Sequence, residues 1–167
     1  MKTLTQPAPS HNGQEQYEIR LQQFLRILHR MPTDQEIQSN PQNNNKYLAI
    51  SYMEMKLDEL FFGLWETVDF QYHLTTSEVA GKIDLRVFHP IAKVWITRSG
   101  VASTPLQDPN ATSGNLRTNF NPTPLEKALP HLKAECIKNA ARSLGKLFGR
   151  DLNRDYEDTY KPLLKVR

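Results

Sequence analysis

Basic side chains recur at helical spacing near the end of the chain. The group comprises Lys127, His131, Lys138 and Arg142, with Lys146 at its edge. A helix turns by about 100° per residue, so these side chains gather on one of its sides. A row of cations of this kind can bind phosphates or other anions. The ordinary alternative is the solvated face of an amphipathic helix, and charge alone does not decide between the two.

Four further cations fall where strands are expected. They are Lys82, Arg86, Lys93 and Arg98. Side chains on strands beside a helix can extend an anion-binding groove, so these positions are candidate contacts. Exposed strand faces carry such residues without any ligand just as often.

The sequence lacks the common motifs of nucleotide and metal chemistry. The Gly81-Lys82 pair has no upstream glycine at the spacing of a phosphate-binding loop. The five histidines are scattered, and the single cysteine, Cys136, cannot form a zinc site alone. We therefore expect no catalytic residues, no metal and no cofactor.

Two aspartates leave one catalytic alternative open. Asp69 and Asp84 fall on neighbouring expected strands, where their carboxylates could oppose each other. Some nucleases hold Mg²⁺ with carboxylates in this way. Polar residues that alternate along an exposed strand face explain the pair equally well.

Composition indicates one domain with a mildly basic surface. The 167 residues include 21 basic and 18 acidic side chains, for a formal charge of +3, so an anion-binding surface must come from clustering. A lone cysteine fits a reducing compartment. No run of about 18 apolar residues occurs, and the N-terminus lacks the apolar centre of a secretion signal. We expect a soluble, cytoplasmic protein.

The basic residues are positioned by a long helix expected over 124–148. Thr123, Pro124 and Glu126 form a typical helix start. Its apolar side comprises Leu125, Leu129, Leu132, Cys136, Ala140, Leu144 and Leu147. Pro130 predicts a kink or a fresh helix start, and Gly149 predicts the end.

A second amphipathic helix is expected near the start of the chain, over 14–31. Its apolar stripe comprises Tyr17, Leu21, Phe24, Leu28 and Met31. Such a stripe belongs either to the core or to a contact with a neighbouring subunit. After a turn over 33–36, the pattern predicts a short strand over 46–52 and a helix over 54–62.

Period-two alternation then predicts three strands, over 65–75, 79–89 and 92–101. The connections between them are short, which implies antiparallel hairpins. The expected fold class is α+β. An antiparallel meander of three to four strands packs on the long C-terminal helix, and the N-terminal amphipathic helix is an addition to this β-β-β-α core.

The remaining segments are polar. We expect residues 1–13 to be disordered, residues 14–156 to form the single domain, and residues 157–167 to form a tail. The long loop over 103–123 carries one cation, Arg117, and loops of this length are usually functional or mobile.

Several motifs in this arrangement match a known family. The chain has L-E-K-A at 125–128, I-K-N-A-A-R-S-L-G-K-L-F-G at 137–149 and D-Y at 155–156. Weaker matches are L-D-E-L-F-F-G-L-W at 57–65 and R-S-G-V-A at 98–102. Together these segments resemble the Rad-fifty-two type single-strand annealing proteins, whose signature helix has L-E-K-A, a K-R-x-x-R-S-F-G-x-x-x-G run and a closing D-Y.

The resemblance implies a recombination protein that binds single-stranded DNA in a basic groove and anneals complementary strands. It implies a ring or helical filament of identical subunits that needs neither ATP nor metal, with a partner exonuclease and a host single-strand-binding protein as possible partners. Lys138 and Arg142 fall on family positions that contact the DNA backbone, and Asn139 falls on a position that is arginine in eukaryotic members. The short chain is more similar to bacteriophage or prophage members, and residues 14–156 would form the annealing domain.

The physics of annealing fits these residues. Phosphates must be held while base edges stay free, which suits lysine and arginine contacts repeated along an oligomer. Two alternatives remain open. One is a structural oligomer built by the two amphipathic helices with a solvated basic face, and the other is the metal-dependent nuclease with Asp69 and Asp84.

Overall fold

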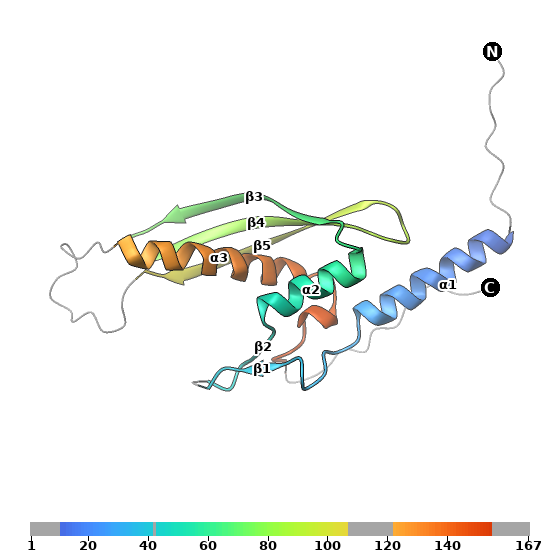
Figure 1. Cartoon of the computed structure of the whole chain (residues 1–167), viewed down its shortest axis with the longest axis horizontal. Helices are drawn as coiled ribbons and strands as arrows, with labels where there is room; N and C mark the ends of the chain where they lie inside the picture. The colour runs from blue at the N-terminus through green and yellow to red at the C-terminus, as the bar shows by residue number, and fades with distance from the viewer. Residues whose placement is uncertain (1–10, 42, 107–121, 155–167) are drawn as a thin grey trace, which may run out of the picture.

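The computed structural model describes residues 11–41, 43–106 and 122–154 (Figure 1). Its elements in chain order are α1 (His11–Leu28), β1 (Gln38–Ser39), β2 (Lys46–Tyr47), α2 (Ile50–Phe61), β3 (Trp65–Leu74), β4 (Glu78–Phe88), β5 (Trp95–Pro105), α3 (Pro122–Arg142) and the 3₁₀ turn η1 (Lys146–Phe148). Helix α1 begins three residues before the expected start at Gln14. The expected tail at 157–167 and most of the 103–123 loop lie outside the described residues.

The expected α+β class is confirmed. Strands β3, β4 and β5 form an antiparallel sheet in that order, and β1 and β2 pair as a second, two-stranded sheet. Helices α2 and α3 lie on the same side of the larger sheet (Figure 1). Among the described residues, no helix combines the length and the apolar composition needed to cross a membrane.

Helix α3 packs directly on strands β4 and β5. The buried residues of β4 alternate along the strand, and they are Val79, Ile83, Leu85 and Val87. The closest approach lies at Gly100 of β5, where an added Cβ would overlap the Cys136 carbonyl oxygen and lie 2.5 Å from the Ala140 nitrogen. Only a residue without a side chain fits there, so Gly100 sets how near α3 lies to the sheet.

Strand β3 contains a bulge that the alternation did not predict. Val68 pairs with Asp84, but the next register pair is Gln71 with Lys82, so two residues of β3 oppose one residue of β4. Asp69 in this bulge has a φ of 54°. The bulge shifts the strand by one residue, so Val68 lies on the face opposite to Phe70 instead of sharing one face with it.

The long helix ends earlier than expected. Helix α3 runs through Pro130 without interruption and stops at Arg142, so Leu144 and Lys146 follow the helix instead of extending it. Gly145 lies against the end of α1, where an added Cβ would lie 2.8 Å from Leu28 Cγ. The chain turns here, and the absence of a side chain at Gly145 lets it pass directly against Leu28.

Helix α2 begins at Ile50, so the strand expected over 46–52 is limited to the two residues of β2. Met53, Leu57 and Phe61 are buried and recur at helical spacing, and this packing overrides the weak alternation before them. Phe62 caps the helix in the left-handed conformation, with a φ of 56°.

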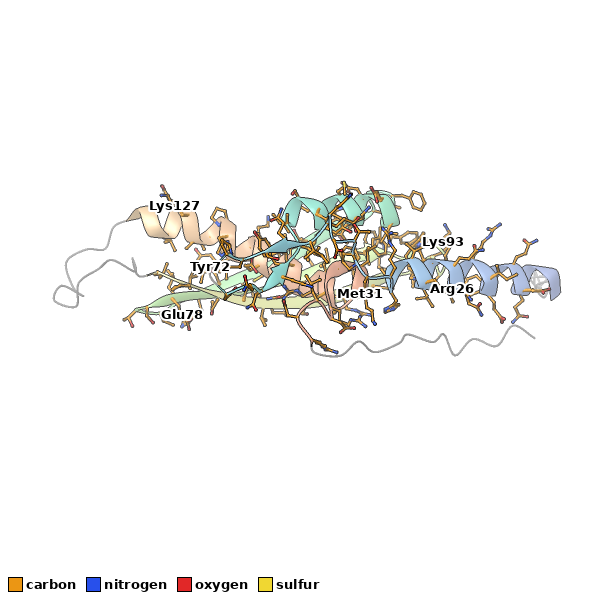
Figure 2. The ribbon with its side chains drawn as sticks, turned by 90° about the horizontal axis from the view of Figure 1, so that it is seen from below. Arg26, Met31, Tyr72, Glu78, Lys93 and Lys127 are labelled. Carbon is orange, nitrogen blue, oxygen red and sulfur yellow. The ribbon has the colours of Figure 1, made fainter. Side chains whose placement is uncertain are left out.

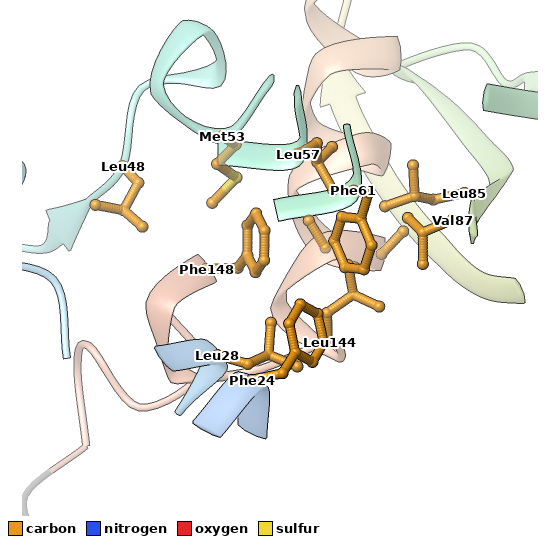
Figure 3. Close-up of a cluster of buried hydrophobic side chains, with 12 residues drawn as sticks. Phe24, Leu28, Leu48, Met53, Leu57, Phe61, Leu85, Val87, Leu144 and Phe148 are labelled. Carbon is orange, nitrogen blue, oxygen red and sulfur yellow. The ribbon is translucent and has the colours of Figure 1, made fainter. Parts of the chain in front are cut away.

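The larger core cluster lies where α1, α2, α3 and η1 meet the sheet (Figure 3). Its labelled members are Phe24, Leu28, Leu48, Met53, Leu57, Phe61, Leu85, Val87, Leu144 and Phe148. A second cluster lies between α3 and the other half of the sheet, and it includes Val79, Ile83, Leu132 and Cys136. Burial raises the pKa of the Cys136 thiol, in agreement with a small buried apolar residue.

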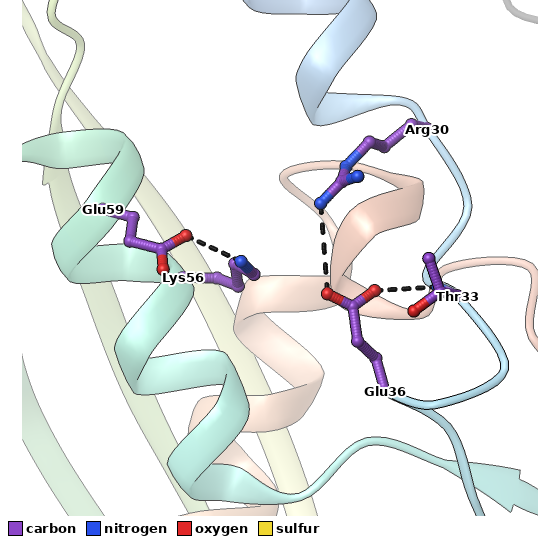
Figure 4. A network of polar contacts seen from close by, with 5 residues as sticks. All are labelled: Arg30, Thr33, Glu36, Lys56 and Glu59. Carbon is purple, nitrogen blue, oxygen red and sulfur yellow. Dashed lines mark hydrogen bonds and ion pairs between the residues drawn. The ribbon is translucent and has the colours of Figure 1, made fainter.

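Helix α1 joins this core only by its last turns. Phe24 and Leu28 are buried, and the preceding turns project beyond the rest of the described chain (Figures 1 and 2). After the helix, the Glu36 carboxylate accepts from the Thr33 amide at 2.8 Å and lies 4.0 Å from Arg30 (Figure 4). The hydrogen bond from the Thr33 amide to Glu36 is one of the two bonds in the capping pattern expected over 33–36. It closes a turn here, and no helix begins after it.

His89 is the buried histidine of the β4–β5 connection. Its ring lies 4.8 Å from that of Phe24, and its Nδ1 accepts from the amides of Ile91 at 3.2 Å and Ala92 at 3.0 Å. Burial lowers the pKa of this imidazole below its ordinary value of 6.5. The native fold therefore requires a neutral ring with Nδ1 unprotonated.

The close approach at Gly100 predicts that two glycine-to-alanine substitutions lower the free energy of unfolding by different amounts. Gly100→Ala should lower the free energy of unfolding by about 3 kcal/mol, because backbone atoms of α3 cannot move aside. Gly81→Ala on the neighbouring strand should cost less, about 1.5 kcal/mol, because its Cβ would meet the movable end of the Leu132 side chain at 2.9 Å and a single backbone atom, the Gln71 carbonyl oxygen, at 3.1 Å. Urea unfolding of both variants tests this, and equal losses would contradict it.

His89 predicts a loss of stability in mild acid. Well above pH 6.5 the histidine is neutral in both states, and its contribution to stability does not change with pH. Below pH 6.5 the unfolded chain binds the proton first, so the free energy of unfolding falls, by at most about 1.4 kcal/mol per pH unit. His89→Asn, which keeps an acceptor, should flatten this slope in urea unfolding between pH 5 and 7. The exposed control His73→Asn should keep the slope of the unchanged protein. An unchanged slope in His89→Asn would contradict the role given to His89.

Candidate nucleic-acid interface

Four basic residues of α3 lie on the side of the helix that faces away from the sheet. They are Lys127, His131, Lys138 and Arg142, of which the first two are exposed and the last two partly exposed. The opposite side of the helix packs on β4 and β5. The structure thus brings these four together, and the fifth, Lys146, is separated from them.

Lys138 is held between a carboxylate and an aromatic ring. It forms an ion pair with Glu135, one turn earlier on the helix, and its Nζ lies 5.8 Å from the centre of the Tyr47 ring. Only 12% of its side chain is exposed. The Lys138 charge is therefore fixed in position and partly balanced before any ligand arrives.

The contact with Tyr47 connects β2 to this side of α3. Asn153 strengthens the connection, because its side chain accepts from the Lys46 amide at 2.8 Å and donates to the Lys46 carbonyl at 2.7 Å. The exposed Lys46 thus belongs to the same region as Lys138. Sequence analysis missed Lys46 and Tyr47, because they follow an Asn-rich segment that has no periodicity.

Arg142 is held against the edge of the sheet through Asn139. Its guanidinium donates to Asn139 Oδ1 at 2.9 Å, and Asn139 Nδ2 donates to the Val101 carbonyl of β5 at 2.8 Å. Asn139 therefore positions a neighbouring cation, although its place in the family motif suggested a direct contact. The Arg142 Nε is buried with no partner among the described residues.

Positive charge gathers where α3 ends. Arg150 donates to the carbonyls of Arg142 at 3.1 Å and Ser143 at 2.5 Å, where the helix dipole favours a cation. Strand β5 runs antiparallel to α3, with Gly100 against Ala140. Arg98, two residues earlier on the same face, is therefore level with this helix end. Arg150 had a sequence signal, since a basic residue after Gly149 is typical of a helix C-terminus.

Lys146 was expected at the edge of the basic row, and that placement is wrong. The residue lies in η1, is 4% exposed, and its Nζ is 3.5 Å from the buried carboxylate of Asp151. Arg154 also pairs with Asp151, at 3.0 Å. The helix ends before Lys146, so this side chain turns into the interior.

Lys82 and Arg86 do not share a groove with α3. They alternate with the buried residues of β4 and therefore lie on the sheet face that α3 does not cover. Lys82 lies 3.5 Å from Asp84, and Arg86 lies 2.6 Å from Glu66 and 5.1 Å from the centre of the Trp95 ring. Their charges are thus already balanced.

Lys93 is also separate from the helix cations. It is exposed in the β4–β5 connection with a φ of 57°, and its amide donates to the His89 carbonyl at 2.9 Å. Of the four cations expected on or beside strands, only Arg98 lies near the basic side of α3.

The two aspartates of the nuclease alternative do not oppose each other. Register pairs Asp84 with Val68, while Asp69 occupies the bulge. The Ser99 hydroxyl donates to Asp84 at 2.6 Å and, with the nearby Lys82 ammonium, holds the pKa of this carboxyl below its ordinary value. The part of the chain that the structure describes contains no group of three or more histidine, cysteine, aspartate or glutamate residues arranged to hold a metal ion.

No protein-family model matches the sequence, and no curated protein is significantly similar to it.

The burial of Lys146 predicts a structural role. Lys146→Met should lower the free energy of unfolding by about 3 kcal/mol, because Asp151 would lose one of its partners inside the protein. The control Lys127→Met, at an exposed position of α3, should change it by less than about 0.5 kcal/mol. Chemical denaturation measures both, and equal stabilities would contradict the role assigned to Lys146.

Proposed function

We propose that this protein binds single-stranded DNA along the basic side of α3 and anneals complementary strands without ATP. The observation that supports the proposal most is the fixed position of its two central cations. Tyr47 and Glu135 hold Lys138, and Asn139 holds Arg142. Cations already fixed lose little conformational freedom when they meet a phosphate.

Three further cations extend the row formed by Lys138 and Arg142 in both directions along α3. Lys127 lies toward the start of α3, and Arg98 and Arg150 lie at its end. Lysine and arginine contacts to phosphates hold a strand without reading its sequence, and base edges stay free to pair. The Tyr47 ring lies beside these cations and can pack against a sugar or base.

Annealing further requires that one strand be held over many nucleotides. We propose that identical copies assemble into a ring or filament, so that a few contacts per copy repeat along the DNA. The activity would take place in the cytoplasm and would use strands exposed by an exonuclease, in competition with a host single-strand-binding protein.

A structural oligomer with no DNA role is the second candidate. One specific observation favours it: Lys138 already has Glu135 as its partner, as expected for a helix face that only meets water. Binding measurements distinguish the two candidates, because the structural oligomer should show no salt-dependent affinity for an oligonucleotide.

Removal of the two central charges should weaken DNA binding without unfolding the protein. Lys138→Met with Arg142→Met keeps most of the half-buried stems, and we expect affinity for a single-stranded oligonucleotide to fall at least roughly tenfold at low salt. Loss of two phosphate contacts should also reduce the slope of log affinity against log salt by about 1.4. Fluorescence anisotropy across a salt series measures both quantities, and strand-pairing assays should show a parallel loss of rate.

The matched control removes two cations from the other face of the sheet. Lys82→Met with Arg86→Met should leave the affinity and the salt slope near those of the unchanged protein. Circular dichroism of each variant checks that it is folded. Equal affinity for all three proteins, or no acceleration of pairing by the unchanged protein at low salt, would refute the proposed function.

A further inference from the structure

Glu135 is an acidic residue in the middle of the basic side of α3. The helix has two acidic residues, Glu126 and Glu135, nine positions apart. At about 100° per residue, they lie on opposite sides of the helix. Glu135 instead shares the side of His131, one turn before it, and of Lys138 and Arg142, one and two turns after it. A carboxylate thus interrupts the row of cations that is proposed to hold DNA.

The carboxylate of Glu135 contacts the ammonium group that a phosphate would bind. It forms an ion pair with Lys138, whose side chain is only 12% exposed, and Glu135 is the more exposed partner, at 28%. Any phosphate oxygen that reaches the Lys138 ammonium therefore comes close to a second negative charge. The phosphate and the carboxylate repel each other while they share this cation.

Tyr47, on β2, supports Lys138 without opposing a phosphate. Its ring face attracts the ammonium group, which lies 5.8 Å from the ring centre, and the ring has no net charge. The strand is held independently of Glu135, because Asn153 bonds to both the amide and the carbonyl of Lys46. Lys138 therefore keeps this support when the carboxylate is displaced.

We propose that Glu135 competes with phosphate for Lys138 and thereby shortens the time for which a DNA strand stays bound. This role rests on the proposed function, and it adds a means of release to the same site. Ion pairs at this spacing stabilise a helix only slightly, so a phosphate can displace the carboxylate. The carboxylate remains one turn away on the same helix, so it returns to Lys138 as soon as the phosphate leaves.

The two central cations then have different roles. Arg142 is held by the neutral side chain of Asn139, which does not repel a phosphate. Lys138 is paired with a carboxylate, which does. Arg142 thus keeps hold of the strand while Lys138 releases it, and a strand that is released in part can shift its register against a complementary strand.

The test removes the charge of Glu135 and keeps its shape. In the full chain, Glu135→Gln should slow the release of a fluorescent single-stranded oligonucleotide at low salt by roughly fivefold. This factor corresponds to the loss of one repulsion between unit charges about 4 Å apart in water. Stopped-flow fluorescence with an excess of unlabelled strand measures the release rate, and circular dichroism checks that the variant is folded.

The matched control makes the same change of net charge on the opposite side of α3. Glu126→Gln should leave the release rate near that of the unchanged protein, because Glu126 lies two and a half turns from Glu135 and faces away from the basic row. Equally slow release in both variants would overturn the inference, since it would indicate a general effect of charge.

A second background tests whether Glu135 acts through Lys138. When Lys138→Met is already present, the addition of Glu135→Gln should change the release rate by less than about twofold, because no phosphate is then held beside residue 135. A full fivefold effect in this background would overturn the inference. So would faster release in Glu135→Gln alone, which would mean that the carboxylate only positions the lysine.

The same measurement separates this inference from the proposed function. Absence of oligonucleotide binding by the unchanged protein would refute both. Binding by the unchanged protein, with equal release rates for it and for Glu135→Gln, would refute the role of Glu135 alone.

Discussion

The contact between the backbones of β5 and α3 determines the rest of the structure. At Gly100 no side chain separates the strand from the helix, and Cys136 and Ala140 of α3 lie directly above it. Close packing of this kind tolerates neither a shift nor a rotation of the helix. The side of α3 that faces the sheet is therefore fixed, and so is the side that faces away.

This constraint sorts the basic residues of the chain into groups. The fixed rotation places Lys127, His131, Lys138 and Arg142 on the solvent side, and the sheet separates them from Lys82 and Arg86. Helix α3 ends at Arg142, and Lys146, beyond this end, lies in the interior beside Asp151. The packing at Gly100 and the early end of α3 thus determine which cations are available to a ligand and which stabilise the fold.

Much of the fold could be predicted because it depends on local periodicity. The period-two pattern of 79–89 appears in the structure with small shifts at its ends, and the helical pattern of 124–148 appears as α3, which ends early at Arg142. The bulge at Asp69 could not be predicted, since an inserted residue in β3 is defined only by its pairing with β4. The contact of Gly145 with Leu28 could not be predicted either, because the two residues are far apart in the sequence.

The candidate site could likewise be predicted only where it depends on local spacing. Helical spacing was sufficient to group Lys127, His131, Lys138 and Arg142, because all four lie on a single element. Spacing could not reveal Tyr47 beside Lys138 or the link from Arg142 through Asn139 to Val101, because these contacts join segments that are far apart in the sequence. It also could not show that Lys82 and Arg86 already have carboxylate partners.

The balance of charge explains why the proposed function needs more than one copy of the chain. Few cations of one chain remain for DNA, since Lys138 is partly balanced by Glu135 and several others have acidic neighbours. Binding by one copy would be weak and easily reversed, which annealing needs if strands are to search for their register. A long strand can still be held if copies repeat the same few contacts, because linked sites multiply weak affinities.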